Sequence, residues 1–369
     1  MRFPTRCDFS ARGFLCGLSI FWALGPWLPI DHGHRPVYGQ SPVDAAKDDA
    51  QGYELSFPAM GTIVAFQAFS EDPSSVERAF SLARKEIDRL TEILSDYSTE
   101  SETVLLSRPE KTGQWQSVSP ELWEVLQICD VWHGISRGSL DASIGQLTSL
   151  WRKARKNRSI PIQREIEAAL EQSGWHHVHF DKQLRKVKLD REGLKFDFGA
   201  MGKGYIIDKA YDCLKSAGVP RSLVRAGGDL RCGEPPPGRA GWGVEIARLV
   251  RGEKSSQRML LSNAAISSSG DFFQYTLIEG KRHSHVLDPC TGWGVLGPRM
   301  VTVVAATSTE ADVADTALCG LPPRDAMVIA QTLKSIDVRI ANASDSNGEE
   351  IEITMTPGFK RRLITSDEQ

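Results

Sequence analysis

Hydrophobic residues recur at helical spacing in several stretches of the chain. Between residues 76 and 94 the apolar positions fall three or four residues apart, which places them on one face of a helix. Ser74 and Ser75 precede this stretch and are the expected caps of its first turn. The same spacing predicts helices over residues 122–135, 165–172, 203–217, 311–320 and 324–334.

Apolar runs and alternating patterns predict strands between these helices. Residues 63–68 form a buried run after a Met60-Gly61-Thr62 turn, and residues 178–198 alternate as in a hairpin. Further strands are predicted over residues 222–230, 242–247, 259–268, 272–278 and 300–306. Because helices and strands are mixed, with runs of strands in the second half, the pattern predicts an α+β (mixed α/β) fold rather than a regular parallel array.

The first thirty residues differ from those that follow. Three arginines precede an uncharged apolar run over residues 13–30, which is typical of an export signal. A transmembrane anchor is the alternative, although Gly25, Pro26 and Pro29 interrupt the run. Residues 31–51 lack apolar periodicity and predict a flexible tether. We therefore expect an export signal or anchor at 1–30, a tether at 31–51 and one domain over 52–369, in a protein that is periplasmic or membrane-anchored facing the periplasm.

Composition narrows the classes of partner. The 369 residues suffice for a large buried core, and 44 basic against 47 acidic residues give a formal charge of −3. Such a balance offers no basic surface of the kind that nucleic-acid binding needs, so a nucleic-acid partner is disfavoured. The cysteines after residue 30 show no short paired spacing, which predicts neither a disulfide framework nor a zinc site.

A glycine-rich segment over residues 197–205 joins a strand end to a helix start. Free backbone N–H groups and the positive helix end favour an anion at such a loop, although the Walker spacing is absent. A tight turn that needs glycine for its backbone conformation is an equal alternative. Lys203, at the helix start, favours the anion. A second glycine pair, Gly227-Gly228 before Asp229, suggests either a ligand contact or a hairpin corner.

Two further segments carry polar groups suited to catalysis. Asp312 and Thr316 are four residues apart and therefore share one helical face. A carboxylate and a hydroxyl, together with backbone carbonyls, form the oxygen set that Mg²⁺ accepts, whereas helix capping by Asp312 is the plain alternative. His285 ends a predicted strand, where an imidazole can take a proton from a hydroxyl near neutral pH.

Taken in order, nine segments between Pro58 and about Gly320 resemble the ApbE family, the FAD:protein FMN transferases. The matching segments are Ala59-Met60-Gly61-Thr62, Leu94-Ser95-Asp96-Tyr97, residues 138–145, Leu150-Trp151, residues 197–205, Gly227-Gly228-Asp229, Ser269-Gly270-Asp271, residues 285–292 and residues 311–316. The resemblance implies an ApbE/T-fold-like single catalytic domain with mixed, largely antiparallel sheets flanked by helices. It also implies Mg²⁺-dependent transfer of FMN from FAD to a threonine or serine hydroxyl of an acceptor protein, with release of AMP.

The same resemblance implies roles for individual residues. His285 corresponds to the base, and the metal ligands correspond to the carbonyl of Ala200, Asp312 and Thr316, with Asp315 adjacent. The positions similar to the family's FAD contacts are Met60, Tyr97, Ser139, Leu140, Asp141, Asp197, Lys203 and Leu287. Ala200, Cys290 and Asp315 depart from the residues usual in the family at their positions, and none of them removes a group that the reaction needs.

Two alternative functions remain open from the sequence. The same metal site would serve an FAD pyrophosphatase, in which water attacks FAD to give FMN and AMP. A non-catalytic FAD-binding protein is the other alternative, although intact Asp312, Thr316 and His285 argue against it. The expected partners are thus FAD and an acceptor protein, with possible inner-membrane association through the N-terminus.

Overall fold

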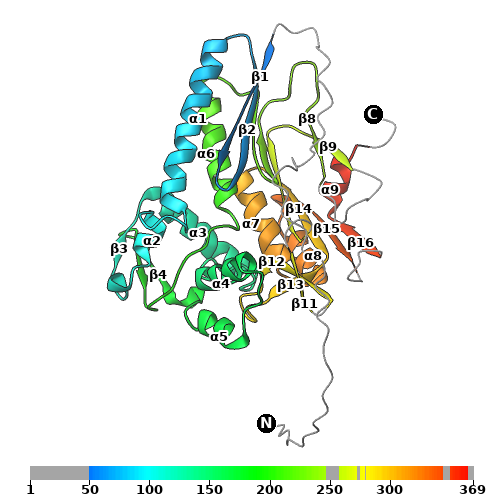
Figure 1. The fold of residues 1–369 in the computed structure, drawn as a ribbon. Coiled ribbons are helices and arrows are strands. Elements are labelled where there is room, and N and C mark those ends of the chain that lie inside the picture. Colours follow the sequence, from blue (N-terminus) through cyan, green and yellow to red (C-terminus); the bar gives the residue numbers. More distant parts are fainter. Residues whose placement is uncertain (1–49, 247–256, 272–274, 279, 344–349, 365–369) are drawn as a thin grey trace, which may run out of the picture. The chain divides into compact units, whose positions relative to one another are not determined.

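An eight-stranded antiparallel sheet is the centre of the computed structural model (Figure 1), which describes residues 50–246, 257–271, 275–278, 280–343 and 350–364. Its strands pair only with antiparallel neighbours. In spatial order they are β1 (Gln51–Ala59), β2 (Thr62–Ser70), β6 (Ser222–Ala226), β7 (Asp229–Cys232), β10 (Ala264–Gly270), β14 (Arg299–Ala305), β15 (Ile336–Ala343) and β16 (Ile351–Met355).

The two faces of this sheet bury separate groups of side chains, because successive residues of a strand point to opposite faces. Val301 and Val303 of β14 join the larger core, to which α1, α6, α7 and α8 contribute, whereas Val304 joins a smaller core. The helices of the first face are α1 (Pro73–Leu94), α6 (Gly202–Ser216), α7 (Ser308–Cys319) and α8 (Pro323–Thr332). The smaller core is closed by β8 (Trp242–Glu245), β9 (Arg258–Leu261) and α9 (Pro357–Arg362).

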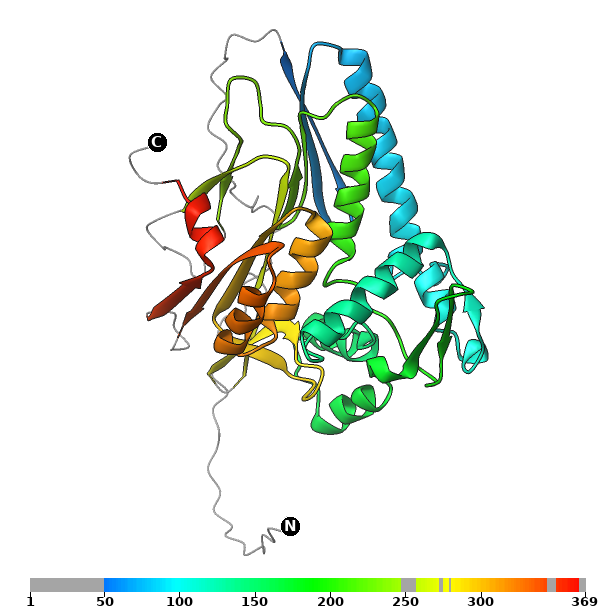
Figure 2. The same ribbon diagram turned by 180° about the vertical axis from the view of Figure 1, so that it is seen from behind.

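The remaining elements lie between α1 and α6 in sequence or form a small sheet after β10 (Figure 2). The first set comprises α2 (Glu102–Leu106), the short 3-10 helix η1 (Pro109–Lys111), β3 (Gln116–Ser117), α3 (Pro120–Ile135), α4 (Gly145–Lys156), α5 (Gln163–Glu171), the 3-10 helix η2 (Trp175–His177), β4 (Val178–Asp181) and β5 (Lys186–Leu189). The small sheet comprises β11 (Tyr275–Ile278), β12 (Lys281–Leu287) and β13 (Gly294–Gly297).

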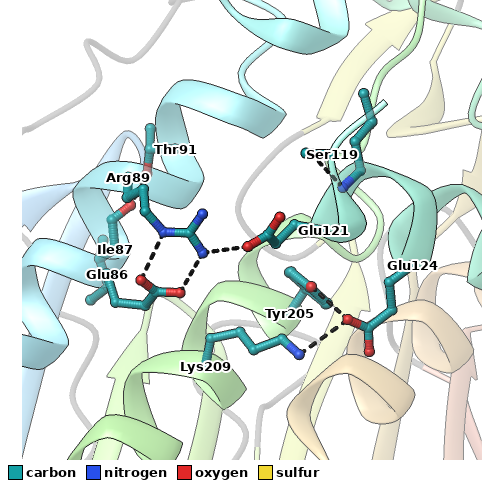
Figure 3. A network of polar contacts seen from close by, with 10 residues as sticks. Glu86, Ile87, Arg89, Thr91, Ser119, Glu121, Glu124, Tyr205 and Lys209 are labelled. Carbon is teal, nitrogen blue, oxygen red and sulfur yellow. Dashed lines mark hydrogen bonds and ion pairs between the residues drawn. The ribbon is translucent and has the colours of Figure 1, made fainter. Parts of the chain in front are cut away.

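Polar contacts hold α1, α3 and α6 together at one end (Figure 3). The guanidinium of Arg89 donates two hydrogen bonds to Glu86, at 2.9 and 2.7 Å, and a third to Glu121 at 2.7 Å. The hydroxyl of Tyr205 donates to Glu124 of α3 at 2.7 Å. Tyr205 is buried, so this bond fixes the first turn of α6 against α3.

The structure confirms the mixed α+β class with largely antiparallel sheets, and it corrects several boundaries. Asp72, not Ser74 or Ser75, caps α1. The predicted strands 222–230 and 259–268 are each divided, the first at Gly227-Gly228 and the second before β10 at Asn263, whose φ is 47°. Elements absent from the sequence predictions include α2, α4, β13, β15, β16 and α9.

The predicted hairpin over residues 178–198 is shorter than expected. It ends with β5 at Leu189, and Leu194 and Phe196 lie buried outside the named strands. Between them, Lys195 forms an isolated bridge with Ile144. The alternation at Leu194 and Phe196 thus reflects packing against the core and not a further pair of strands.

The predicted N-terminal segments fall largely outside the described residues. That applies to the export signal or anchor at 1–30 and to the tether at 31–51 up to residue 49, and β1 starts at Gln51. Among the residues that are described, the helices are all too short or too polar to cross a membrane. The cysteines in this part of the chain are free, as their spacing predicted; they are Cys129, Cys213, Cys232, Cys290 and Cys319.

The beginning of α7 is held against α6 by a carboxylate and by a glycine. Asp208 of α6 accepts hydrogen bonds from the backbone N–H groups of Ser308 and Thr309, both at 2.8 Å, and from the Thr309 hydroxyl at 2.6 Å. At Gly204, a β-carbon would lie 2.4 Å from the carbonyl oxygen of Ser308. Only glycine therefore permits this approach, which brings the first turns of both helices into contact.

We expect Asp208→Ala to lower the free energy of unfolding by about 2 kcal/mol, because first-turn N–H groups of α7 lose their acceptor. Urea denaturation measures the change. Asp212→Ala is the matched control, since Asp212 lies on the same helix and is exposed. A loss no greater for Asp208→Ala than for Asp212→Ala would contradict this role.

Candidate active site

Three buried aspartates meet at the junction of the central sheet and α7. Asp229 begins β7, and Asp312 and Asp315 lie on α7. Their exposed fractions are 2%, 2% and 0%, and one carboxylate oxygen from each lies within 4.8 Å of the others. Like charges this close raise one another's pKa unless a cation or a proton offsets them.

Lys203 supplies one positive charge to this cluster. Its ammonium forms an ion pair with Asp229 and lies 3.6 Å from Oδ1 of Asp312. Burial opposes a charge on Lys203, but the charges of Asp229 and Asp312 outweigh that effect and raise its pKa. Burial, with the charge of Asp229 adding to it, raises the pKa of Asp312 to about 7 although Lys203 acts in the opposite direction. One lysine thus does not neutralise three carboxylates.

The hydroxyl of Ser267 links two of these carboxylates. The hydroxyl of Ser267 lies 2.5 Å from carboxylate oxygens of both Asp229 and Asp315. A hydroxyl has one proton and can donate it to only one of them at a time, so Ser267 bridges the two carboxylates. Burial, together with the charges of Asp312 and Asp229, raises the pKa of Asp315 well above its usual range. Lys203 alone therefore leaves this cluster with excess negative charge.

Hydroxyl groups extend the cluster along β10. Ser269 and Thr316 approach to 2.7 Å between their Oγ and Oγ1 atoms, and Thr316 donates to Asp315 at 3.1 Å. The structure thus brings together three of the predicted metal ligands, Asp312, Asp315 and Thr316. Carboxylates in excess of their counter-charge, surrounded by hydroxyl oxygens, fit a hard divalent cation such as Mg²⁺. The fourth predicted ligand, Ala200, lies in the loop that leads into α6.

The glycine-rich loop differs from its expected form. Its N–H groups contact the protein itself: Gly199 donates to Asp197 at 2.7 Å, and Gly202 donates to the Phe198 carbonyl at 2.7 Å. Gly204 donates to Oδ2 of Asp312 at 2.8 Å. The anion at the start of α6 is therefore a side chain of α7. Asp312 does not cap its own helix, whose cap is Thr307.

Asp229 is the main functional residue that the sequence left without a role. Its glycine pair was consistent with a hairpin corner, and the turn between β6 and β7 is one. The same turn nevertheless places Asp229 in the ion pair with Lys203. In the sequence, the only indication of this role was a carboxylate directly after two glycines. The pairing of β7 with β10 shows that Asp229 lies beside the cluster.

Met60 lies in the turn between β1 and β2 with a φ of 51°, a conformation that non-glycine residues seldom adopt. The neighbouring strands carry the Gly227 turn to the same end of the sheet, where a β-carbon on Gly227 would lie 3.6 Å from Thr62. Met60 and Asp229 therefore lie at the same end of the sheet. Strain of this kind is often kept where a side chain has a functional contact.

Tyr97 and Asp197, two further predicted FAD contacts, are linked through Arg152. The ring of Tyr97 is 77% exposed, and the Arg152 guanidinium lies over it at 4.6 Å from the ring centroid. The same guanidinium pairs with Asp96 and, at 2.5 Å, with Asp197. Arg152 was not among the predicted site residues.

Four other predicted FAD contacts make internal contacts in this structure. The Ser139 hydroxyl donates at 3.0 Å to the carbonyl of Ala317, the residue that follows Thr316. Leu140 and Leu287 are buried in the hydrophobic core. Asp141 accepts from Ser143 and from the backbone of Trp175. These four side chains are therefore held by contacts within the protein itself.

His285 is exposed on β12, the central strand of the small sheet. This sheet is joined to the end of β10 by Arg282, whose Nε lies 2.8 Å from Oδ2 of the buried Asp271. Asp271 is two residues beyond Ser269, which contacts Thr316. The predicted base thus belongs to a strand anchored beside the aspartate cluster.

Solved structures of ApbE proteins share this fold. An ApbE protein from Thermotoga maritima superposes with a TM-score of 0.74 at 26% identity, covering 85% of this chain and 100% of that one. A variant of the flavin transferase ApbE from Vibrio cholerae gives a TM-score of 0.76 at 23% identity, covering 85% and 100%.

The sequence comparisons define the family. The model of the ApbE family matches residues 60–340. The FAD:protein FMN transferase of Escherichia coli K12 is 28% identical over 290 residues, which cover 76% of this chain and 80% of that protein. The chain belongs to the ApbE family, whose named relatives are transferases.

We expect Lys203→Met to lower the free energy of unfolding by about 3 kcal/mol, because buried carboxylates lose their counter-charge. The value is at the low end for a buried pair, since 34% of the Lys203 side chain stays exposed. An acid whose pKa is raised by folding binds more protons in the folded state, so stability falls as pH rises. Without Lys203 the pKa values of the aspartates in the cluster rise further. The loss of unfolding free energy caused by Lys203→Met should therefore increase between about pH 6 and pH 8.

Urea denaturation of both proteins at the two pH values measures this effect. Lys209→Met is the matched control, because Lys209 lies on the same helix and pairs with the exposed Glu124 at 3.1 Å. Its loss should stay below about 1 kcal/mol. A Lys203→Met loss that is small and independent of pH would show that the lysine does not offset the cluster.

Proposed function

We propose that this chain is a Mg²⁺-dependent FAD:protein FMN transferase that moves FMN from FAD to a threonine or serine hydroxyl of an acceptor protein and releases AMP. The observation that carries the proposal is the set of oxygen atoms formed by the buried Asp312 and Asp315 and the half-buried Thr316. Family membership supports FAD as the substrate. A diphosphate is the kind of group that a bound Mg²⁺ and a nearby lysine recognise together.

In the proposed reaction, the acceptor hydroxyl oxygen forms a bond to the FMN-side phosphorus. The bond from that phosphorus to the bridging oxygen breaks, and AMP leaves with the electron pair. His285 takes the proton of the attacking hydroxyl. Mg²⁺, held by Asp312, Asp315, Thr316 and the carbonyl of Ala200, would neutralise charge on the diphosphate.

The chain's own residues prepare this site. Lys203 and the Gly204 N–H fix the carboxylate of Asp312, so its orientation does not depend on the substrate. Met60, Tyr97 and the pair Asp197 and Lys203 of the glycine-rich loop are proposed to contact FAD from three segments of the chain. Preorganised groups of this type lower the barrier because they need little rearrangement during the reaction.

The proposal includes export to the periplasm, either released or anchored through the N-terminal segment. It rests on the arginines and the apolar run of residues 1–30. The acceptor is therefore expected to be an exported or membrane protein with an accessible threonine or serine.

Asp312→Ala should abolish FMN transfer to an acceptor peptide containing threonine, because the cation loses a carboxylate ligand. Mass spectrometry detects the added FMN, with and without Mg²⁺ and after treatment with EDTA. Asp325→Ala, an exposed aspartate of α8, is the matched control and should retain activity. Transfer by Asp312→Ala at the wild-type rate would show that the assignment of the metal ligand is wrong.

The same assay distinguishes the pyrophosphatase. Release of FMN and AMP from FAD without acceptor, and no peptide-bound FMN when acceptor is present, would establish hydrolysis instead of transfer. FAD that remains intact in both arms would establish a binding protein. Peptide-bound FMN with an equivalent amount of AMP is the result that we expect.

His285→Ala should lower kcat for transfer by about 10²- to 10⁴-fold while the affinity for FAD changes little, because a general base acts in the transition state. His283→Ala is the control on the same strand, since His283 already contacts the Gly294 carbonyl at 3.2 Å. Steady-state kinetics with varied FAD separate kcat from KM. Equal losses in both variants would contradict a specific role for His285.

A further inference from the structure

Arg152 of α4 joins two loops that are far apart in sequence. One of its terminal nitrogens pairs with Asp96, and the other lies 2.5 Å from Oδ2 of Asp197. The guanidinium also lies over the ring of Tyr97. Asp96 and Tyr97 follow α1, whereas Asp197 belongs to the glycine-rich loop before α6. Arg152 is therefore the residue through which these loops are held together.

The two carboxylates would repel each other without this arginine. Burial and the charge of Asp197 raise the pKa of Asp96, while Arg152 lowers it. Asp197 also accepts the Gly199 N–H at 2.7 Å, so its carboxylate has a second partner within its own loop. A planar guanidinium with two separate terminal nitrogens can pair with both carboxylates at once, and a lysine ammonium offers only a point charge.

Tyr97 is held in an unusual way for so exposed an aromatic side chain. One face of its ring is covered by the guanidinium, while 77% of the residue remains accessible. A cation fixed over one face of an aromatic ring reduces the conformations that the ring explores before a ligand binds. The remaining surface can then stack against a planar heterocycle.

We propose that Arg152 is a positioning residue for the dinucleotide, which holds the Tyr97 ring beside the Asp197 loop as a stacking surface for a ring of FAD. This inference rests on the proposed function, because it takes FAD as the ligand. Arg152 acts through Tyr97 and Asp197 and is not itself a catalytic residue. Its loss should therefore weaken FAD binding and leave the chemical step nearly intact.

The test measures binding of FAD to the purified protein without acceptor, so that no transfer occurs. Arg152→Met should raise the Kd for FAD by about tenfold, and Arg152→Lys should give an intermediate value. In the transfer assay, KM for FAD should rise while kcat stays within about twofold of wild type. Lys153→Met, which removes the same charge from an exposed neighbouring position, should leave both values unchanged.

A double-mutant cycle with Tyr97→Ala shows whether the arginine acts through the ring. If it does, Arg152→Met should weaken binding in the Tyr97→Ala background by much less than in wild type. Equal losses in both backgrounds, or an unchanged Kd in Arg152→Met, would overturn the inference. Thermal unfolding identifies any variant that fails to fold, and Arg152→Lys then provides the comparison.

The outcomes also separate this inference from the proposed function. If the wild-type protein binds no FAD, both the proposed function and this inference are wrong. Wild-type protein that binds and transfers FMN, together with an Arg152→Met variant of equal affinity, would leave the function intact and exclude the role of Arg152.

Discussion

Three buried carboxylates beside one lysine impose the constraint on which the site depends. Removing charges from water is costly, and like charges at this distance add to the cost. The structure offsets it with Lys203, with the Gly204 N–H and with the Ser267 hydroxyl. These groups come from α6 and β10, whereas the carboxylates come from β7 and α7, so the cluster exists only when these elements have packed together. A divalent cation would supply the charge that the side chains lack.

The close approach of α6 and α7 follows from this constraint. Gly204 lets the helices touch where the carboxylate of Asp312 must reach a backbone N–H, and Asp208 holds the same end of α7 from outside the cluster. The central sheet then supplies the remaining partners, because β7 and β10 are neighbours and carry Asp229 and Ser267. The charge balance of the cluster therefore depends both on the order of the strands and on the contact between α6 and α7.

Sequence patterns predicted the parts of this arrangement that are local. The helical face that carries Asp312 and Thr316 follows from their spacing, and most of the predicted helices and strands are present. Contacts between distant segments were not predictable in this way. Asp229 faces Lys203 because of strand order, and Arg152 reaches Asp197 because α4 packs beside the loop, which periodicity does not encode. The Gly204 N–H pairs with Asp312 for the same reason, whereas Gly199 and Gly202 donate to acceptors within their own loop.

The two acidic pairings of this region have different physical consequences. Around Lys203 the negative charge exceeds the positive charge, and the site is therefore suited to a cation that brings a diphosphate with it. Around Arg152 one guanidinium is shared by two carboxylates, and the remaining interaction is directed at an aromatic ring. The first arrangement favours charge neutralisation and the second favours shape and stacking. A dinucleotide has both a diphosphate and planar rings, so neither arrangement alone would define its orientation. The Asp197 loop connects them, since it pairs with Arg152 at one end and leads to Lys203 at the other.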